Sequence, residues 1–261
     1  MIPRKPARRI GLARALSKLG YCSRSRAAEL IRAGRVRLNE GVRFDPETPV
    51  HLTRDRILVD DRPAEAREKI YLMMNKLRGL ITTASDEKGR DTVYSLLGGS
   101  ALAAEEVFPW VSPVGRLDKA SEGLLLLTND SEWGARVAAP ETDLKKTYHV
   151  QIAKVADDKL IASLVAGVNV AGKSCAGETL SAAQARLLRS GQKNCWLEII
   201  LDEGKNRQIR RMMQALGIEV LRLVRVAIGP LELGKLAKGD CRPLTSDEKE
   251  AMDRAMRAST S

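Results

Sequence analysis

The sequence predicts an α+β fold with two unequal domains, a small basic domain followed by a larger one built on a mainly antiparallel sheet. Near the start of the chain, hydrophobic residues repeat at helical spacing and then alternate. From residue 70 onward, β-rich segments are interspersed with shorter helical ones, without regular βαβ repeats or a glycine-rich nucleotide fingerprint. The expected division is a front domain over 9–60, a linker over 61–69, a large domain over 70–250 and a tail over 251–261.

Two short helices are expected at the front of the chain. Residues 11–19 place leucines at helical spacing and are followed by Gly20, which suits a C-terminal cap. Ser23 is suited to capping a second helix, which Gly34 would end. The apolar stripes of both helices predict that they pack against a common core.

The pattern changes to a period of two over residues 35–44, which predicts a β-hairpin. Val36 and Leu38 alternate with arginines, and an Asn-Glu-Gly turn leads to Val42 and Phe44. One face of the hairpin is expected to pack on the two helices and the other to present arginines. A further strand over 56–59 would complete the domain.

The charge of the chain favours a polyanionic partner, with nucleic acid ahead of a membrane. The formal net charge is +11 and the pI is near 9.7. Residues 1–62 hold fifteen basic side chains against seven acidic ones, so most of the excess lies in the first quarter of the chain. The arginines expected to grip phosphate there are Arg24, Arg26, Arg32, Arg35, Arg37 and Arg43.

Composition also argues against several other classes of protein. Four widely spaced cysteines and two histidines form no zinc pattern, and reduced thiols in a cytoplasmic protein are expected. No apolar run approaches the roughly 20 residues that cross a bilayer.

The large domain is expected to contain at least five strands and three helices. Alternating or continuous apolar runs predict strands over 70–75, 123–128, 147–153, 195–201 and 220–228. Helical spacing predicts helices over 131–138, 156–166 and 206–216.

The most informative segment of the large domain is residues 113–130, PVGRLDKASEGLLLLTND. The run Leu124 to Leu127 is typical of a strand buried on both faces. Asp118 lies just before this run, and a carboxylate beside a hydrophobic wall is an arrangement that catalysis often uses. Taken alone, Asp118 could equally cap the turn that leads into Ser121 and Glu122.

The helix expected over 206–216 carries several arginines. Asn206 is suited to capping it and Gly217 to ending it. Four apolar residues follow helical spacing and are expected to form its buried stripe: Ile209, Met212, Met213 and Leu216. Arg207 and Arg211 fall on the opposite face, and Arg210 lies towards its edge.

Ordered motifs along the chain resemble those of one family of enzymes. Residues 9–60, with SRSRAAELIRAGRVRLNEG at their centre, resemble the S4 RNA-binding module. The string GRLDKASEGLLLLTND resembles the catalytic motif of the RsuA/RluB-type pseudouridine synthases. Four further strings match that family in order: NKLRG (75–79), KKTY (145–148), EGKNRQIRRM (203–212) and IGPLELGKL (228–236). Departures include Leu77, where the family commonly has proline, and Ser131, where it commonly has glycine.

The resemblance implies isomerisation of uridine in ribosomal RNA, with a lean towards the large subunit, and needs no cofactor and no metal. It makes Asp118 the essential carboxylate, Tyr148 the residue that contacts the target base and Arg210 the partner that keeps Asp118 ionised. Ile228 and Leu231 would line the uracil pocket. The further side chains expected to contact RNA are Arg116, Lys205, Arg207 and Arg211, with Arg116 filling the space of the unstacked base or holding a phosphate.

Some alternatives stay open at this level. Asp118 could attack the sugar or base covalently, or remove the C2′ proton to give a glycal. The RNA could be free or in a pre-ribosomal particle, and the protein is expected to be a monomer without a membrane partner. A non-catalytic S4-type RNA-binding or ribosome-assembly protein would explain the front domain alone, and an RNA hydrolase would use Asp118 and Glu122 with a metal ion.

Overall fold

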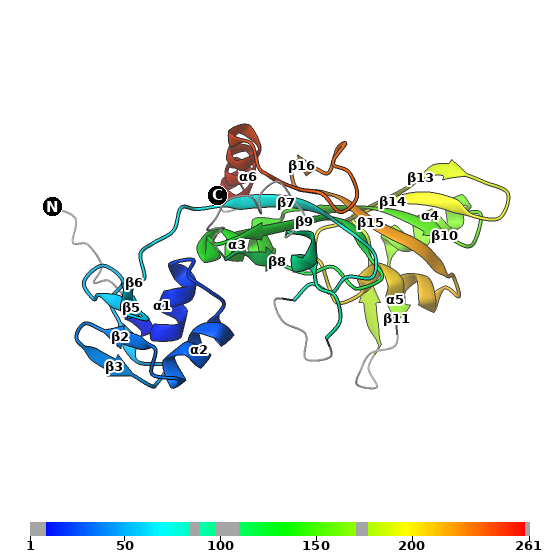
Figure 1. Ribbon diagram of the computed structural model, residues 1–261. Helices are drawn as coiled ribbons and strands as arrows, with labels where there is room; N and C mark the ends of the chain where they lie inside the picture. Colours follow the sequence, from blue (N-terminus) through cyan, green and yellow to red (C-terminus); the bar gives the residue numbers. More distant parts are fainter. Residues whose placement is uncertain (1–8, 84–88, 98–109, 171–176, 259–261) are drawn as a thin grey trace. The chain divides into compact units, whose positions relative to one another are not determined.

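The computed structural model describes residues 9–83, 89–97, 110–170 and 177–258 (Figure 1). It divides into two compact units: of the described residues, the first comprises 9–71, 110–112 and 127–134, and the second comprises the rest, so a few residues of the strands and helices described below with the second unit belong to the first. In the part of the chain that is described, no helix is long and apolar enough to cross a membrane.

The first unit packs two helices against a small antiparallel sheet (Figure 1). Its helices are α1 (Leu12–Lys18) and α2 (Arg24–Arg32), and Ser23 caps α2 by accepting a hydrogen bond from the Arg26 amide at 3.1 Å. The sheet order is β3-β2-β5-β6, with β2 (Val36–Leu38), β3 (Gly41–Arg43), β5 (Ile57–Val59) and β6 (Arg62–Pro63). A separate pair joins β1 (Ile10–Gly11) to β4 (Pro49–Val50).

The expectation that Val42 and Phe44 share the buried face of the hairpin is wrong. Residues directly opposite each other in antiparallel strands share a face of the sheet. Val42 lies opposite Arg37, whereas the fully buried Val36 lies opposite Arg43. This register places Val42 on the outward face. Val42 is 42% and Phe44 64% exposed.

The segment expected to be a linker begins later than residue 61. Arg62–Pro63 forms β6 and pairs with β5, and Ala64 is buried in the core of the first unit. The sheet thus continues past the expected boundary at residue 60.

The second unit is built around a nine-stranded sheet, which confirms the mainly antiparallel architecture. Its main path is β13-β14-β10-β15-β9-β7-β17. The bounds are β7 (Tyr71–Lys76), β9 (Glu122–Thr128), β10 (Lys146–Ile152), β13 (Gln184–Ser190), β14 (Cys195–Leu201), β15 (Val220–Ile228) and β17 (Cys241–Pro243). Antiparallel pairing joins β13 to β14, β14 to β10, β10 to β15 and β7 to β17, whereas β15 and β9 run parallel.

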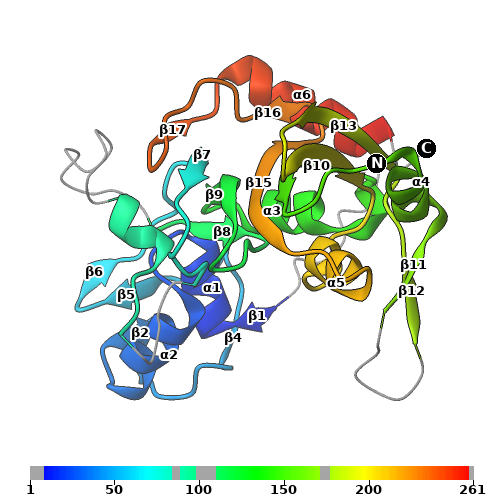
Figure 2. The ribbon, with the colours of Figure 1, turned by 90° about the vertical axis from the view of Figure 1, so that its right-hand side faces the viewer.

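Shorter elements complete the second unit. Strand β8 (Ser112–Val114) pairs with β9, and β16 (Leu231–Glu232) pairs with β15. The remaining bounds are η1 (Val93–Leu96), α3 (Ser131–Ala138), η3 (Pro140–Thr142), α4 (Asp158–Ala166), β11 (Val168–Val170), β12 (Glu178–Leu180), α5 (Gln208–Ala215) and α6 (Ser246–Ala258). Helix α5 packs beside the β11–β12 ribbon (Figure 2).

The C-terminal segment is not the tail expected from residue 251. Helix α6 runs across that boundary, and its Met252 and Met256 are buried. Only residues 259–261 of the expected tail lie outside the described part of the chain.

Strand β9 confirms the expectation for the leucine run. Leu124 to Leu127 are all 0% exposed, and the strand lies between β15 and β7. Gly123 permits the parallel pairing: its φ is +101°, and a Cβ there would lie 2.2 Å from the Arg225 carbonyl oxygen. The polar segment ahead of β9 is therefore held at the middle of the sheet.

Candidate active site

Asp118 lies on the loop between β8 and β9 and lines a cavity of about 300 Å³, here named the Asp118 cavity. Its side chain is 32% exposed, so the carboxylate is half-buried and still reachable. Tyr148 from β10 and Arg207 from the start of α5 line the same cavity. Three motifs far apart in the sequence thus meet around one carboxylate.

The backbone of the Asp118 loop is held by a donor at every carbonyl from residue 117 to 121. Thr82 Oγ1 donates to Leu117 O at 2.8 Å, and the Gly79 amide donates to Lys119 O at 2.7 Å. Lys76 Nζ donates to Asp118 O and to Ser121 O, and the Ser121 amide also donates to Asp118 O. Arg210 Nη2 donates to Ala120 O. Such bracing fixes the direction of the carboxylate before any ligand arrives.

Lys76 donates from a fully buried position, at 1% exposed. Its ammonium donates to Leu77 O at 3.0 Å, Asp118 O at 3.2 Å and Ser121 O at 2.9 Å. Burial lowers the pKa of Lys76 to about 8, while the charges of Asp118 and Glu122 oppose that shift. Lys76 is therefore a positioning residue under the loop.

The ion pair expected between Asp118 and Arg210 is not formed, because Arg207 takes that place. Arg207 Nη1 lies 3.4 Å from Asp118 Oδ2. Arg210 Nη2 instead donates to Ala120 O at 2.9 Å. Burial, and then the charge of Arg207, lowers the pKa of Arg210, while Asp118 acts in the opposite sense. Arg210 thus supports the loop and adds positive potential near Asp118.

The start of α5 explains this exchange of roles. The helix begins at Gln208, with Arg207 at the N-cap in the left-handed region (φ +49°), so Asn206 is not the cap that was expected. That backbone turn brings the Arg207 side chain to the Asp118 loop. Ile209, Met212 and Met213 form the buried stripe as expected. Leu216 does not belong to it, since it is 37% exposed beyond the last turn.

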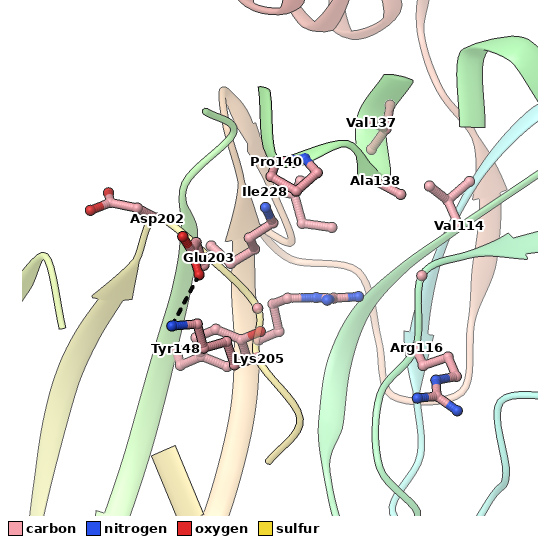
Figure 3. Close-up of a pocket in the computed structure, with 14 residues that line it drawn as sticks. Val114, Arg116, Val137, Ala138, Pro140, Tyr148, Asp202, Glu203, Lys205 and Ile228 are labelled. Carbon is pink, nitrogen blue, oxygen red and sulfur yellow. Dashed lines mark ion pairs between the residues drawn. The ribbon is translucent and has the colours of Figure 1, made fainter. Parts of the chain in front are cut away.

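Figure 3 shows side chains that line a second cavity of about 380 Å³, here named the Arg225 cavity. The two cavities share five lining residues, Gly115, Arg116, Tyr148, Gly204 and Lys205. Ile228 lines the Arg225 cavity, and its role in a uracil pocket stays a prediction. Leu231 is 1% exposed and lines neither cavity, so its expected pocket role is not seen in this geometry.

The expected RNA-contacting side chains of this unit divide into two groups. Arg116 and Lys205 line both cavities, and the guanidinium of Arg116 has no hydrogen bond or ion pair with the described residues. Arg211 lies away from both cavities and pairs with Glu178 at 2.8 Å. Lys205 also pairs with Glu178, at 3.6 Å.

The six arginines of the first unit are not equally available to an anion. Three of them are engaged by carboxylates: Arg26 by Glu29, Arg35 by Asp60 and Arg37 by Asp61. Arg24, Arg32 and Arg43 are exposed and form no ion pair with a described residue. The unpaired positive charge is thus smaller than the count of arginines indicates.

Glu122 is not placed to share a metal ion with Asp118. Arg222 donates to both of its carboxylate oxygens, at 3.1 and 2.9 Å, and Lys238 lies 3.5 Å away. Burial alone would raise the pKa of Glu122, but these two cations hold it below its ordinary value. Within the described residues, no group of three or more His, Cys, Asp or Glu could hold a metal ion.

Sequence reasoning missed Lys76, Lys146 and Arg225 at the site. A signal was present for two of them: Lys76 ends the apolar run YLMMNK and Arg225 interrupts the strand VLRLVRVAI. Lysine and arginine are seldom fully buried, so a charged residue inside an apolar strand indicates a specific internal role.

Comparisons with known proteins agree with this geometry. A family model described as S4 domain matches residues 10–65, and one described as RNA pseudouridylate synthase matches residues 70–215. The chain is 34% identical to ribosomal large subunit pseudouridine synthase B of Bacillus subtilis, with 91% of this chain and 93% of that protein covered. It is 36% identical to an uncharacterized RNA pseudouridine synthase of Rickettsia bellii, with 90% and 96% covered.

A solved structure gives the same result. The crystal structure of a pseudouridylate synthase superposes with a TM-score of 0.62 at 28% identity and covers 93% of this chain and 99% of that one. The S4 domain together with the match to RNA pseudouridylate synthases identifies an enzyme that modifies RNA. The chain belongs to the RNA pseudouridylate synthase family.

Proposed function

We propose that this protein converts a specific uridine of ribosomal RNA, in the large subunit, into pseudouridine, with Asp118 acting on the target nucleotide. The observation that carries the proposal is the placement of the half-buried Asp118 carboxylate, with Tyr148, in a cavity beside a fully braced loop. The large-subunit target rests on the name of the Bacillus subtilis relative.

The proposed reaction is an isomerisation of one nucleotide. Pseudouridine formation breaks the N1–C1′ bond, turns the uracil and joins C5 to C1′, so the nucleotide is isomerised. Asp118 either bonds to the nucleotide or removes the C2′ proton, and both routes need an ionised carboxylate within reach of the ribose. Arg207 Nη1 lies 3.4 Å from Asp118 Oδ2 and gives the carboxylate a cationic partner in the cavity.

The other side chains of the site supply access and orientation. A uridine in structured RNA must leave its stack, at a cost of a few kcal/mol. Arg116, exposed and without a partner in the described part of the chain, would hold a phosphate or fill the vacated space. The ring of Tyr148, common to both cavities, would stack on the extruded base.

Replacing Asp118 by Asn tests the assignment. The amide keeps the size of the side chain but cannot act as a nucleophile or base, so we expect loss of tritium release from ribosomal RNA carrying 5-tritiated uridine. RNA affinity should remain within about threefold of wild type, because phosphate contacts supply most of it. Turnover by the variant near the wild-type rate would overturn the proposed role of Asp118.

The target and the enzymatic class have their own controls. Pseudouridine mapping in ribosomal RNA from a strain lacking the protein should show the loss of a large-subunit position, and a small-subunit loss would overturn that part of the proposal. Tight RNA binding by the wild-type protein without tritium release would favour the non-catalytic, ribosome-assembly alternative.

A further inference from the structure

The Arg225 cavity owes its composition to an irregularity between β10 and β15. Lys146 lies opposite Ile228 and Tyr148 lies opposite Arg225, with a register shift between the two pairs. Arg225 and Ile228 are three residues apart and would face opposite sides of a regular strand. The extra residue in β15 puts both on the face that carries Lys146 and Tyr148. All four side chains line the cavity.

Two cations in this cavity form no direct ion pair with a described residue. Arg225 is 6% exposed, its Nε donates to Leu124 O at 2.8 Å, and its Nη2 is enclosed without a hydrogen-bond partner in the described residues. Lys146 is half-buried; burial, and then the charge of Arg225, lowers its pKa. Neither side chain forms an ion pair with a described residue. A buried cation left unpaired is costly, which indicates that a ligand completes the site.

The walls of the cavity favour a planar base over a phosphate. Val114, Val137, Pro140 and Ile228 supply apolar surface, and Tyr148 supplies an aromatic ring (Figure 3). Asp202 and Glu203 also line the cavity, so a phosphate there would meet two carboxylates as well as the cations. A base offers a flat apolar face to such walls and a polar edge to the cations.

The donors discriminate between the two pyrimidines. Arginine and lysine only donate hydrogen bonds, and they accept none. Uracil presents carbonyl oxygens at positions 2 and 4, whereas cytosine carries an amino group at position 4. A cytosine placed in this cavity would set its amino donor against a cation and leave the cation unsatisfied.

We propose that Arg225 and Lys146 bind the carbonyl edge of the extruded uracil, select it against cytosine and stabilise the negative charge that it carries when detached. This inference rests on the proposed function. When the N1–C1′ bond breaks, its electron pair stays on the ring and is delocalised over N1, O2 and O4. The ring turns, C5 bonds to C1′, the C5 proton leaves to a base or to water, and N1 gains a proton. Nothing is oxidised or reduced, and the two cations face the oxygens that carry the charge.

The first test is kinetic and uses the full chain with a large-subunit ribosomal RNA transcript carrying 5-tritiated uridine. Lys146→Gln and Arg225→Lys should each lower kcat for tritium release roughly 10- to 100-fold, with KM for RNA within about threefold of wild type. Lys159→Gln in α4 and Arg189→Lys in β13 change exposed cations outside the cavity and should retain the wild-type rate.

The second test measures binding without catalysis. Protein labelled with ¹⁵N-arginine is titrated with uridine 5′-monophosphate, cytidine 5′-monophosphate or inorganic phosphate, and the Arg225 Nε–H signal is assigned by its loss in Arg225→Lys. The uridine nucleotide should shift this signal, and the other two should not. The two nucleotides share their ribose and phosphate, so a difference between them isolates the base edge.

The outcomes separate this inference from the proposed function. Wild-type kcat in both variants would overturn the inference. So would an Arg225 signal that the uridine nucleotide does not shift, or that both nucleotides shift alike. In each of these cases, tritium release by the wild-type protein would still uphold the proposed function. A shift by inorganic phosphate would make the cavity a phosphate site instead. Absence of tritium release from the wild type would count against the proposed function itself.

Discussion

At the scale of single residues, the site depends on how the Asp118 loop is held. Its five consecutive carbonyls all accept a hydrogen bond, and two of these come from the buried ammonium of Lys76. Arg207 supplies the direct ion pair to the carboxylate, and Arg210 supports the backbone beneath it. Two arginines of one motif thus have separate roles, which the spacing of the motif alone does not reveal.

Lys76 also predicts a pH dependence of stability. Burial lowers its pKa in the folded protein to about 8, from 10.5. Between these values the unfolded chain binds more protons than the folded one, so the contribution of Lys76 to the free energy of unfolding rises with pH across this window. Relative to a Lys76→Met variant, the wild type should gain about 1–2 kcal/mol between about pH 7 and about pH 9.5.

Urea unfolding at both pH values measures this difference. Comparing the two proteins removes the groups that titrate alike in both, and so isolates Lys76. A parallel pH dependence in wild type and variant would show that the buried ammonium keeps its ordinary pKa.

At the scale of elements, the close approach of β9 and β15 depends on Gly123. An alanine there would combine a left-handed backbone conformation with a Cβ 2.2 Å from the Arg225 carbonyl oxygen. We expect Gly123→Ala to lower the free energy of unfolding by about 2–4 kcal/mol, through backbone strain and displacement of β15. Since β15 carries Arg225, tritium release should fall as well.

Gly79→Ala is the matched control for Gly123→Ala. Gly79 has a similar φ of +99°, but a Cβ there would meet nothing within 4 Å. Gly79→Ala should lower the free energy of unfolding by about 1 kcal/mol, because only the backbone conformation is unfavourable for alanine there. Equal losses of stability in the two variants, measured by urea unfolding, would show that the packing of β9 against β15 is looser than the structure indicates.

At the scale of the whole molecule, the net charge of +11 should appear as a strong salt dependence of RNA binding. Arg24 and Arg32 are exposed and free of ion pairs with described residues. The double variant Arg24→Ala/Arg32→Ala should bind RNA more weakly and lower the slope of log affinity against log salt by about 2. Its kcat with saturating RNA should not change, because neither residue lines a cavity of the site.

The control for this charge is Arg254→Ala in α6, an exposed arginine that forms a surface pair with Glu250. Filter binding over a range of salt concentrations compares the three proteins. An unchanged salt slope in the double variant would place the phosphate contacts elsewhere on the molecule.

Much of the fold could be predicted because its signals are local. Helical spacing and turn residues indicated α1 and α2, and four consecutive leucines indicated the buried strand β9. The errors arose where a distant strand or turn decided the outcome. The register of β2 against β3 turned Val42 outward, and the conformation of Arg207 displaced the expected cap at Asn206.

The sequence by itself determined the class of fold, the basic front domain and Asp118 as the candidate carboxylate, because periodicity, charge and ordered motifs are properties of the chain. Only the tertiary structure decided which cation meets Asp118 and which side chains share the adjoining cavity. The reason is physical: those contacts depend on strand register and on one extra residue in β15, which reverses the face that Arg225 presents.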